Sequence, residues 1–290
     1  MSTGVLLLLA LLGVAAVAFS VFWWRELRRH AGPHQPTAWQ AGVGFISDFL
    51  DTLGIGSFAT TTSLWRARGT VADEKIPGTL NVGHTLPTIA QALIYTVIIE
   101  VEVATLVSMI IAAVLGAWLG AGIVTRLPRH GVQVGMGIAL LVAALLILGR
   151  LLGAFPAGGD ALGLQGWLFV LALLGNMALG ALMTIGIGAY APIMIMVSLL
   201  GMNEKAAFPI MMGSCAFLMP IAGARFIRSG AYDARAALGL TVLGVPAVLL
   251  AAYIVKELPL DTVRWLVLAV VVYTAASMLL TARSESRRCR

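Results

Sequence analysis

The chain has 290 residues, of which 60% are hydrophobic and only 11% are charged, whereas soluble proteins carry about 25% charged residues. Such an apolar excess cannot be buried in one soluble core beneath a charged surface. We therefore predict an all-α polytopic membrane protein without a sizeable soluble domain. The net charge of +6 does not indicate nucleic-acid binding, because the basic residues sit in short loops, where they set membrane orientation.

The first apolar run covers residues 4–24 and ends at Trp23 and Trp24, which are followed by Arg25 and two further arginines. A signal peptide carries its positive charge before the apolar stretch rather than after it, and tryptophans favour the membrane interface. We therefore predict that segment 1–39 is a retained transmembrane helix and linker, with the N-terminus outside the cell.

Further apolar runs follow in quick succession, and runs of about 18 or more residues are membrane-span candidates. They cover approximately residues 40–65, 79–99, 103–124, 132–152, 166–200, 206–224, 236–255 and 262–282. Arginine and lysine concentrate in alternate connections. These are residues 25–38, 66–78, 125–131, 225–235 and the tail 283–290. The positive-inside rule places them all on the cytoplasmic side, and a composition rich in Ala, Gly, Leu and Arg suggests the plasma (bacterial inner) membrane.

This orientation has a consequence for two of the runs. Segment 40–65 would begin and end inside, and segment 166–200 would begin and end outside. Each must therefore enter the membrane and return as a hairpin of two half-helices. Glycine tolerates backbone conformations that other residues avoid, so the Gly-Ile-Gly sequences at 54–56 and 186–188 mark the expected breaks.

Those two glycine sequences belong to an internal repeat. The matched pairs are Gly54-Ile55-Gly56 with Gly186-Ile187-Gly188, Glu74-Lys75 with Glu204-Lys205, Pro77 with Pro209, and Leu127-Pro128 with Leu258-Pro259, separated by 132, 130, 132 and 131 positions. Paired halves of this size are typical of secondary transporters. We predict two inverted repeats, residues 40–152 and 166–282, each a hairpin plus three spans, joined by an extracytoplasmic loop at 153–165.

Two such breaks predict a shared substrate site, because non-helical backbone inside a membrane is tolerated only where protein or a water-filled cavity covers it. A half-helix N-terminus after each break favours an anion, and nearby hydroxyl, amide and imidazole groups could add donors. The candidate substrate-binding residues are Gly54, Gly56, Ser57, Thr60, Asn81, His84, Gly186, Gly188, Tyr190 and Ser214. The alternative is that the glycines only allow close helix packing.

Asp48 and Asp51 lie inside an apolar run just before the first break. Intramembrane carboxylates are expensive and usually functional, so either could couple transport to protons or sodium. Alternatively, Asp51 satisfies backbone donors of the broken helix. Beside an anion, Asp51 should be protonated, paired or turned away. His84 could add proton linkage, or it could be an ordinary hydrogen-bonded residue between helices.

Other functional classes have weaker support. Cys215 lies in an apolar run and Cys289 in the basic tail, so no disulfide is expected, and neither a metal-ligand spacing nor a cofactor motif is present. A passive anion channel would need a ring of repeated charges or carbonyls. An intramembrane hydrolase built on Ser214 and His84 would need the two side chains in contact. We expect a transporter rather than an enzyme.

The two copies of the pattern resemble the TauE/SafE family of sulfite exporters and anion permeases. The first is Gly44-Phe45-Ile46, Asp51 and Gly54-Ile55-Gly56, and the second is Leu179-Gly180-Ala181, Thr184-Ile185-Gly186-Ile187-Gly188 and Pro192. A small polar cluster containing Asn81 or Ser214 follows each copy. The resemblance covers residues 40–282, leaving 1–39 outside, and implies a permease for sulfite, sulfonates or related sulfur-containing or carboxylate anions. Thr60 stands where the family usually has proline, which implies a narrower or more hydroxyl-lined pocket.

Overall fold

The structure is a computed structural model. It describes residues 3–29, 35–53, 55–154, 159–186, 188 and 190–254, together with isolated residues between 265 and 283. These residues form helices, short 3-10 turns and connections, and no strand occurs among them. Six of the helices are long and apolar enough to cross a membrane. The predicted all-α polytopic fold is therefore confirmed.

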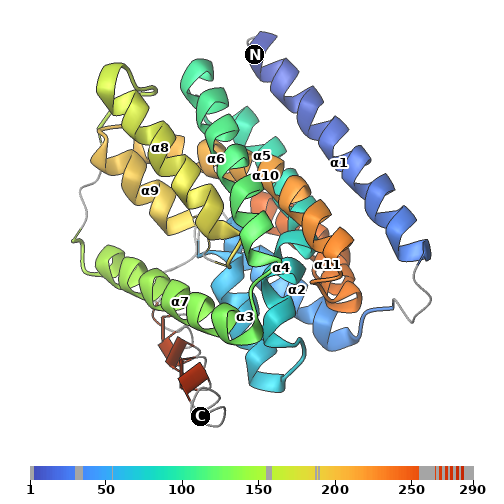
Figure 1. The fold of residues 1–290 in the computed structure, drawn as a ribbon. Coiled ribbons are helices and arrows are strands. Elements are labelled where there is room, and N and C mark those ends of the chain that lie inside the picture. Colours follow the sequence, from blue (N-terminus) through green and yellow to red (C-terminus); the bar gives the residue numbers. More distant parts are fainter. Residues whose placement is uncertain are drawn as a thin grey trace.

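The helices follow one another along the chain, most of them with short connections (Figure 1). Their bounds are α1 Thr3–Arg29, α2 Ala38–Thr52, α3 Ser57–Arg68, η1 Asp73–Lys75, α4 Ile76–Gly83, α5 Thr85–Ile98, α6 Val103–Val124, α7 Arg129–Leu151, α8 Gly166–Met183, α9 Tyr190–Leu199, η2 Glu204–Ala206, α10 Ala207–Ser229 and α11 Ala234–Ile254. The six candidate spans are α1, α6, α7, α8, α10 and α11. The last expected run, 262–282, falls largely outside the described residues.

Both segments that were expected to turn back in the membrane are broken into two helices. The first run is divided into α2 and α3 around Gly56, which has a φ of 93°, and the second into α8 and α9 after Gly186, which has a φ of 109°. These are left-handed backbone conformations that glycine adopts readily. The helix α2 starts at a capping box, in which Thr37 and Gln40 each bond the other's backbone N–H.

The run at 79–99 differs from the single span that was expected, because it is divided into α4 and α5 at His84. Pro87 lies in the first turn of α5 and has no N–H to donate to the carbonyl of Gly83. That carbonyl instead accepts a 2.7 Å hydrogen bond from the Thr241 hydroxyl of α11. Proline thus interrupts the helix, and a neighbouring helix satisfies the backbone group that it leaves free.

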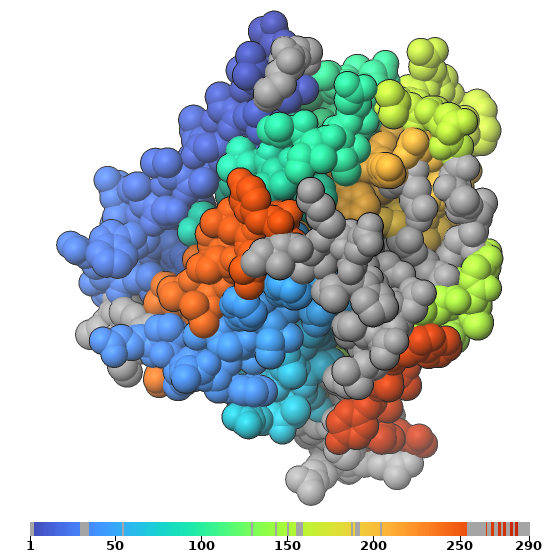
Figure 2. Space-filling view, turned by 180° about the vertical axis from the view of Figure 1, so that it is seen from behind, coloured from blue at the N-terminus to red at the C-terminus, as the bar shows by residue number. Residues whose placement is uncertain are grey.

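The most extensive helix pairings are α2 with α11 and α6 with α8. Each pairs a helix from one predicted half with a helix from the other, and Figure 2 shows α2 beside α11 on the back face. Glycines permit both close approaches: a Cβ on Gly44 would lie 2.6 Å from the Leu240 Cα, and one on Gly116 would lie 1.8 Å from the Met177 carbonyl oxygen. The helix α10 packs against α4, α5 and α6 at the centre, and α1 lies at the periphery (Figure 1).

Four of the basic connections meet at one end of the helix bundle, which we call the basic end. There Arg228 stacks on Phe22, and Arg68 stacks on Trp39. Nearby, the Arg235 guanidinium donates to the Gln35 carbonyl. The basic end comprises the described residues of 22–39, 66–79, 118–129 and 225–235. Charges that the sequence spreads along the chain are therefore gathered on one side.

The far end joins the less basic connections. The N–H of Glu102 donates to the Leu162 carbonyl, and the N–H of Asn203 donates to the Ala161 carbonyl. The turn η1 therefore belongs to the basic end, whereas η2, its counterpart in the sequence repeat, belongs to the far end. The start of α1 also lies at the far end, where Gly4 packs against Val103.

Candidate functional site

A small buried cavity lies where the two helix breaks meet. Its lining residues come from both hairpins and from α5 and α10. They are Asp51, Gly56, Ser57, Phe58, Thr88, Met183, Gly188, Met211, Met212 and Cys215. The cavity has a volume of about 20 Å³, which is space for about one water molecule. In this conformation the cavity is too small to hold an oxyanion.

The first turn of α3 forms the polar side of this cavity. Gly56 is the N-cap residue and offers no side chain to the backbone donors that follow it. The N–H of Ser57 instead donates to Asp51 Oδ1 at 2.7 Å. The helix dipole adds positive character at the same point. This is the arrangement of the second alternative for Asp51, in which its carboxylate satisfies a donor of the broken helix.

The second break supplies the facing wall. Gly188 lines the cavity, and a Cβ added to it would lie 3.8 Å from the Phe58 Cβ. The two hairpins therefore approach each other here across the width of a single side chain. The helix α9 begins at Tyr190, whose side-chain placement lies outside the described features.

Sulfur atoms dominate the remaining wall. Met183, Met211, Met212 and Cys215 all line the cavity, and Cys215 Sγ lies 3.5 Å from Met183 Sδ. Thioethers are flexible and polarisable, so they adapt to contents of different shape. The cavity thus joins a polar face made by α3 and Asp51 to a soft apolar face made by α8 and α10.

A chain of buried polar groups lies behind Phe58. His84 Nδ1 is 2.7 Å from Asp48 Oδ1, and His84 Nε2 is 3.0 Å from Thr61 Oγ1. All three residues are 0% exposed. The ring of Phe58 stacks on the imidazole with a centroid distance of 5.8 Å. Phe58 therefore separates His84 from the cavity while touching both.

The second hairpin carries a neutral link between its first arm and α10. Asn176 of α8 donates from Nδ2 to Ser214 Oγ of α10 at 3.0 Å and to the Met109 carbonyl at 2.7 Å. Like Asp48–His84, this link joins the first arm of a hairpin to the helix that follows the hairpin. Ser214 follows His84 by 130 positions, which is the spacing of the sequence repeat.

The predicted substrate-binding residues divide into three groups. Those that line the cavity are Gly56, Ser57 and Gly188. Those that are buried elsewhere are Thr60, Asn81, His84, Gly186 and Ser214. Gly54 and the Tyr190 side chain lie outside the described features. Among the second group, Thr60 donates its hydroxyl to the Gly56 carbonyl, and Asn81 donates to the Pro77 carbonyl.

Sequence reasoning missed several lining residues, including Phe58, Thr88 and the three methionines. Thr88 had a usable signal, since it lies one helical turn after His84. The methionines had none, because an apolar residue in an apolar run gives no sign of the direction in which it points.

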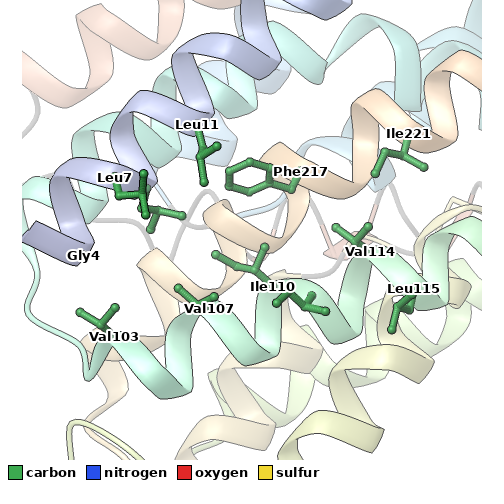
Figure 3. Close-up of a pocket in the computed structure, with 12 residues that line it drawn as sticks. Gly4, Leu7, Leu11, Val103, Val107, Ile110, Val114, Leu115, Phe217 and Ile221 are labelled. Carbon is green, nitrogen blue, oxygen red and sulfur yellow. The ribbon is translucent and has the colours of Figure 1, made fainter.

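A larger cavity lies between α1, α6 and α10 and has a different character (Figure 3). Its volume is about 420 Å³, and its lining is apolar throughout, with residues such as Leu11, Ile110 and Phe217. It offers no donor to an anion. In a bilayer such a groove suits hydrocarbon, so it is not the candidate substrate site.

The family model described as sulfite exporter TauE/SafE matches residues 1–147, about half of the chain. This chain belongs to the TauE/SafE family. The family match begins at residue 1 and so includes α1, which the sequence resemblance had left outside. No curated protein and no solved structure matches the chain.

Membership of the TauE/SafE family, which consists of transporters and not of enzymes, makes the protein a membrane transporter of sulfite-type anions. The geometry also offers no support for a Ser214–His84 hydrolase. Ser214 bonds Asn176, whereas His84 bonds Asp48 and Thr61. Each side chain is engaged by its own half of the protein.

Proposed function

We propose that this protein is a secondary transporter that carries sulfite, a sulfonate or a related carboxylate anion through the cavity between the two helix breaks. The observation that carries the proposal is that Gly56 and Gly188, one from each break, line the same buried cavity. The N-terminus of α3 opens into that cavity and offers the positive dipole end that favours an anion.

We further propose that transport follows alternating access between two inverted halves, residues 40–152 and 166–282. The pairings α2–α11 and α6–α8 support this. In the sequence repeat α2 corresponds to α8 and α11 corresponds to α6, so exchanging the halves turns one pairing into the other. A cavity of about 20 Å³ must widen to admit an oxyanion. Rocking of one half against the other would open it to one side at a time. A passive channel would instead need a continuous pore.

The test is uptake of radiolabelled sulfite by proteoliposomes. Gly188→Leu should abolish saturable uptake, because its side chain would enter the cavity opposite Phe58. A Cβ on Gly188 would meet only the Phe58 Cβ, at 3.8 Å, so the first atom of the new side chain has room and the rest of it fills the cavity. Gly42→Leu on α2 is the matched control, since a Cβ there meets nothing within 4 Å. Equal uptake by both variants, or no saturable uptake by the wild type, would refute the proposal.

Substrate choice is a separate measurement. Purified protein is heated with sulfite, sulfate, sulfoacetate, taurine or small carboxylates, and the melting temperature is compared with that of the free protein. A ligand that binds the folded state stabilises it by about 2.7 kcal/mol at a hundred times its Kd. We expect the sulfur oxyanions to give the largest shift, and a response to taurine alone would argue against an anion site.

A further inference from the structure

We propose that Asp48 and His84 form a proton-binding site that couples anion movement to the proton gradient, with Thr61 as a hydroxyl that serves both protonation states. This inference rests on the proposed transport function and assigns its driving ion. The site lies behind Phe58, outside the cavity, and draws on three separate elements, α2, the α4–α5 break and α3.

The geometry accommodates the proton in both states of the site. In either state His84 Nδ1–H donates to Asp48 Oδ1 across 2.7 Å. In the unloaded state the Thr61 hydroxyl donates to the bare Nε2 nitrogen at 3.0 Å. When Nε2 gains a proton, that N–H donates to Thr61 Oγ1 instead, and the charge of the Asp48–His84 pair changes from −1 to 0. No heavy atom has to move, and no hydrogen bond of the imidazole is lost.

The ligand set favours a proton over a sodium ion. Sodium is a hard cation that seeks several oxygen ligands, whereas imidazole is a proton acceptor or a ligand for softer metals. One Asp48 oxygen is already engaged by the imidazole. The other, Oδ2, is buried without a hydrogen-bond partner among the described residues. It lies against Gly244 of α11, where an added Cβ would be 2.1 Å away.

The site is connected to the cavity by charge and by contact. Asp51, one helical turn after Asp48, brings a second carboxylate to the cavity wall. An anion that enters beside two ionised carboxylates meets strong repulsion in a low-dielectric surrounding. A proton on the Asp48–His84 pair removes one of those negative charges. Entry of the anion and loading of the proton therefore favour each other, which is the requirement for coupling.

Few other titratable groups face the Asp48–His84 pair. Asp51 and the thiol of Cys215 lie on the neighbouring cavity wall, and the Tyr95 hydroxyl donates to the Thr52 carbonyl. The charged residues of the packed helices lie at or near helix ends. They are Arg66 and Arg68 of α3, Arg225 and Arg228 of α10, Arg235 of α11, and Arg25, Glu26, Arg28 and Arg29 of α1. The site is thus set apart from the charges of the basic end.

The second half supplies an internal comparison. Its Asn176–Ser214 link holds the equivalent helices together without any group that titrates near neutral pH. A hydrogen bond alone therefore suffices for that structural role. The Asp48–His84 pair of the first half can also bind and release a proton, which the structural role does not require.

The order Asp48–His84–Thr61 also resembles a hydrolytic triad. A nucleophile must reach its substrate, however, and Thr61 is completely buried and does not line the cavity. The Thr61 hydroxyl bonds the His84 imidazole, and among the described residues no cavity beside it could hold a substrate. Proton binding uses the same three groups without that requirement.

The test measures the steady-state accumulation of radiolabelled sulfite in proteoliposomes under a pH gradient of either direction, with the membrane potential clamped. Protein-free vesicles correct for passive leak, and the ratio is calculated for the sulfite dianion alone, because sulfite itself binds a proton near neutral pH. One proton per anion would change the accumulation ratio by up to about tenfold per pH unit, since tenfold corresponds to about 1.4 kcal/mol. Asp48→Asn and His84→Gln should bring the ratio down to its gradient-free value. The amount of each variant per vesicle is adjusted to give the same exchange rate as the wild type, because leak lowers the ratio of a slower transporter.

The control variant is Asn176→Ala, which removes a buried link of the same kind but no titratable group, so its ratio should equal that of the wild type. A wild type that accumulates sulfite under a sodium gradient and not under a pH gradient overturns the inference, even if every variant is inactive. Full accumulation by Asp48→Asn also overturns it. A wild type that exchanges no sulfite at all refutes the transport function instead, so the two failures are distinguishable.

Discussion

Asp51 brings a carboxylate to the cavity through which an anion is proposed to pass. Its Oδ1 accepts the Ser57 N–H, so the side chain occupies a donor that an anion could otherwise use. At the scale of a single residue, the site is therefore closed to anions by one of its own groups. An anion can bind well only when that carboxylate is neutralised or moves away.

Asp51→Asn tests this competition directly. The asparagine oxygen can still accept the Ser57 N–H, whereas the negative charge is gone. We expect the variant to bind the best stabilising anion more tightly than the wild type at neutral pH, by about tenfold if one nearby charge is worth about 1.4 kcal/mol. Wild-type affinity should rise as the pH falls, because protonation removes the repulsion, and the variant should show a flatter profile. Thermal shifts across pH measure both, and weaker binding by the variant would contradict the argument.

Gly244 is the residue that lets Asp48 approach α11. A Cβ there would lie 2.1 Å from Asp48 Oδ2 and 2.8 Å from Pro87 Cγ. Gly244→Ala should therefore destabilise the protein by about 1–3 kcal/mol, as overpacking of a tight core does. Gly42→Ala, at a position with open space, should be neutral or gain about 0.5–1 kcal/mol of helix stability. Thermal unfolding in detergent compares the melting temperatures of the two variants. Equal values would show that α11 can shift away from Asp48 at little cost in stability.

At the scale of helices, two seams hold the predicted halves together. Gly116 of α6 meets the Met177 carbonyl of α8, and Gly44 of α2 meets Leu240 of α11. Close approach of backbones through small residues drives association where lipid removes the hydrophobic difference between inside and outside. The strength of the fold in the membrane should therefore depend on these glycines more than on the bulky residues around them.

Alanine at either seam tests this dependence. The added Cβ would lie 1.8 Å from a backbone oxygen at Gly116 and 2.6 Å from a backbone carbon at Gly44, so the helices themselves must separate. We expect each variant to lose about 1–3 kcal/mol and to unfold at a lower temperature. Gly13→Ala on α1 is the control, because nothing lies within 4 Å of its Cβ. If Gly116→Ala melts like this control, the α6–α8 seam is not a main source of stability.

The helices also show what the sequence could and could not predict. The charges of the connections predicted that two apolar runs turn back inside the membrane. The structure divides both runs into two helices near the expected glycines. The break at His84 was missed, because its cause is partly distant in sequence: Thr241 satisfies the carbonyl that Pro87 leaves free. The methionine wall was missed for a similar reason. Which face of α10 meets the cavity is decided by packing against other helices, and an all-apolar run carries no periodic signal of it.

At the scale of the whole molecule, the basic connections gather at one end although the residues that meet there lie up to 200 positions apart in the chain. Arg235 reaches Gln35, and Arg68 covers Trp39. The far end instead joins Glu102 to Leu162 and Asn203 to Ala161 through their backbones. The positive-inside rule assigns the end that carries the excess of basic residues to the cytoplasm. We therefore propose that the basic end is cytoplasmic, which would place the start of α1 outside the cell; the predicted cytoplasmic tail 283–290 lies almost wholly outside the described residues.

Cysteine labelling tests this orientation together with the inverted halves. Ala67→Cys and Lys205→Cys place exposed thiols at the basic end and the far end, in a background where Cys215 and Cys289 are replaced by alanine. A membrane-impermeant maleimide should label Lys205→Cys in intact cells and Ala67→Cys only in inside-out vesicles. Because Lys205 follows Lys75 by the repeat spacing, opposite accessibility is what inversion requires. Labelling of both thiols from the same side would refute the inverted arrangement. It would also refute a substrate site that the two helix breaks form from opposite sides of the membrane.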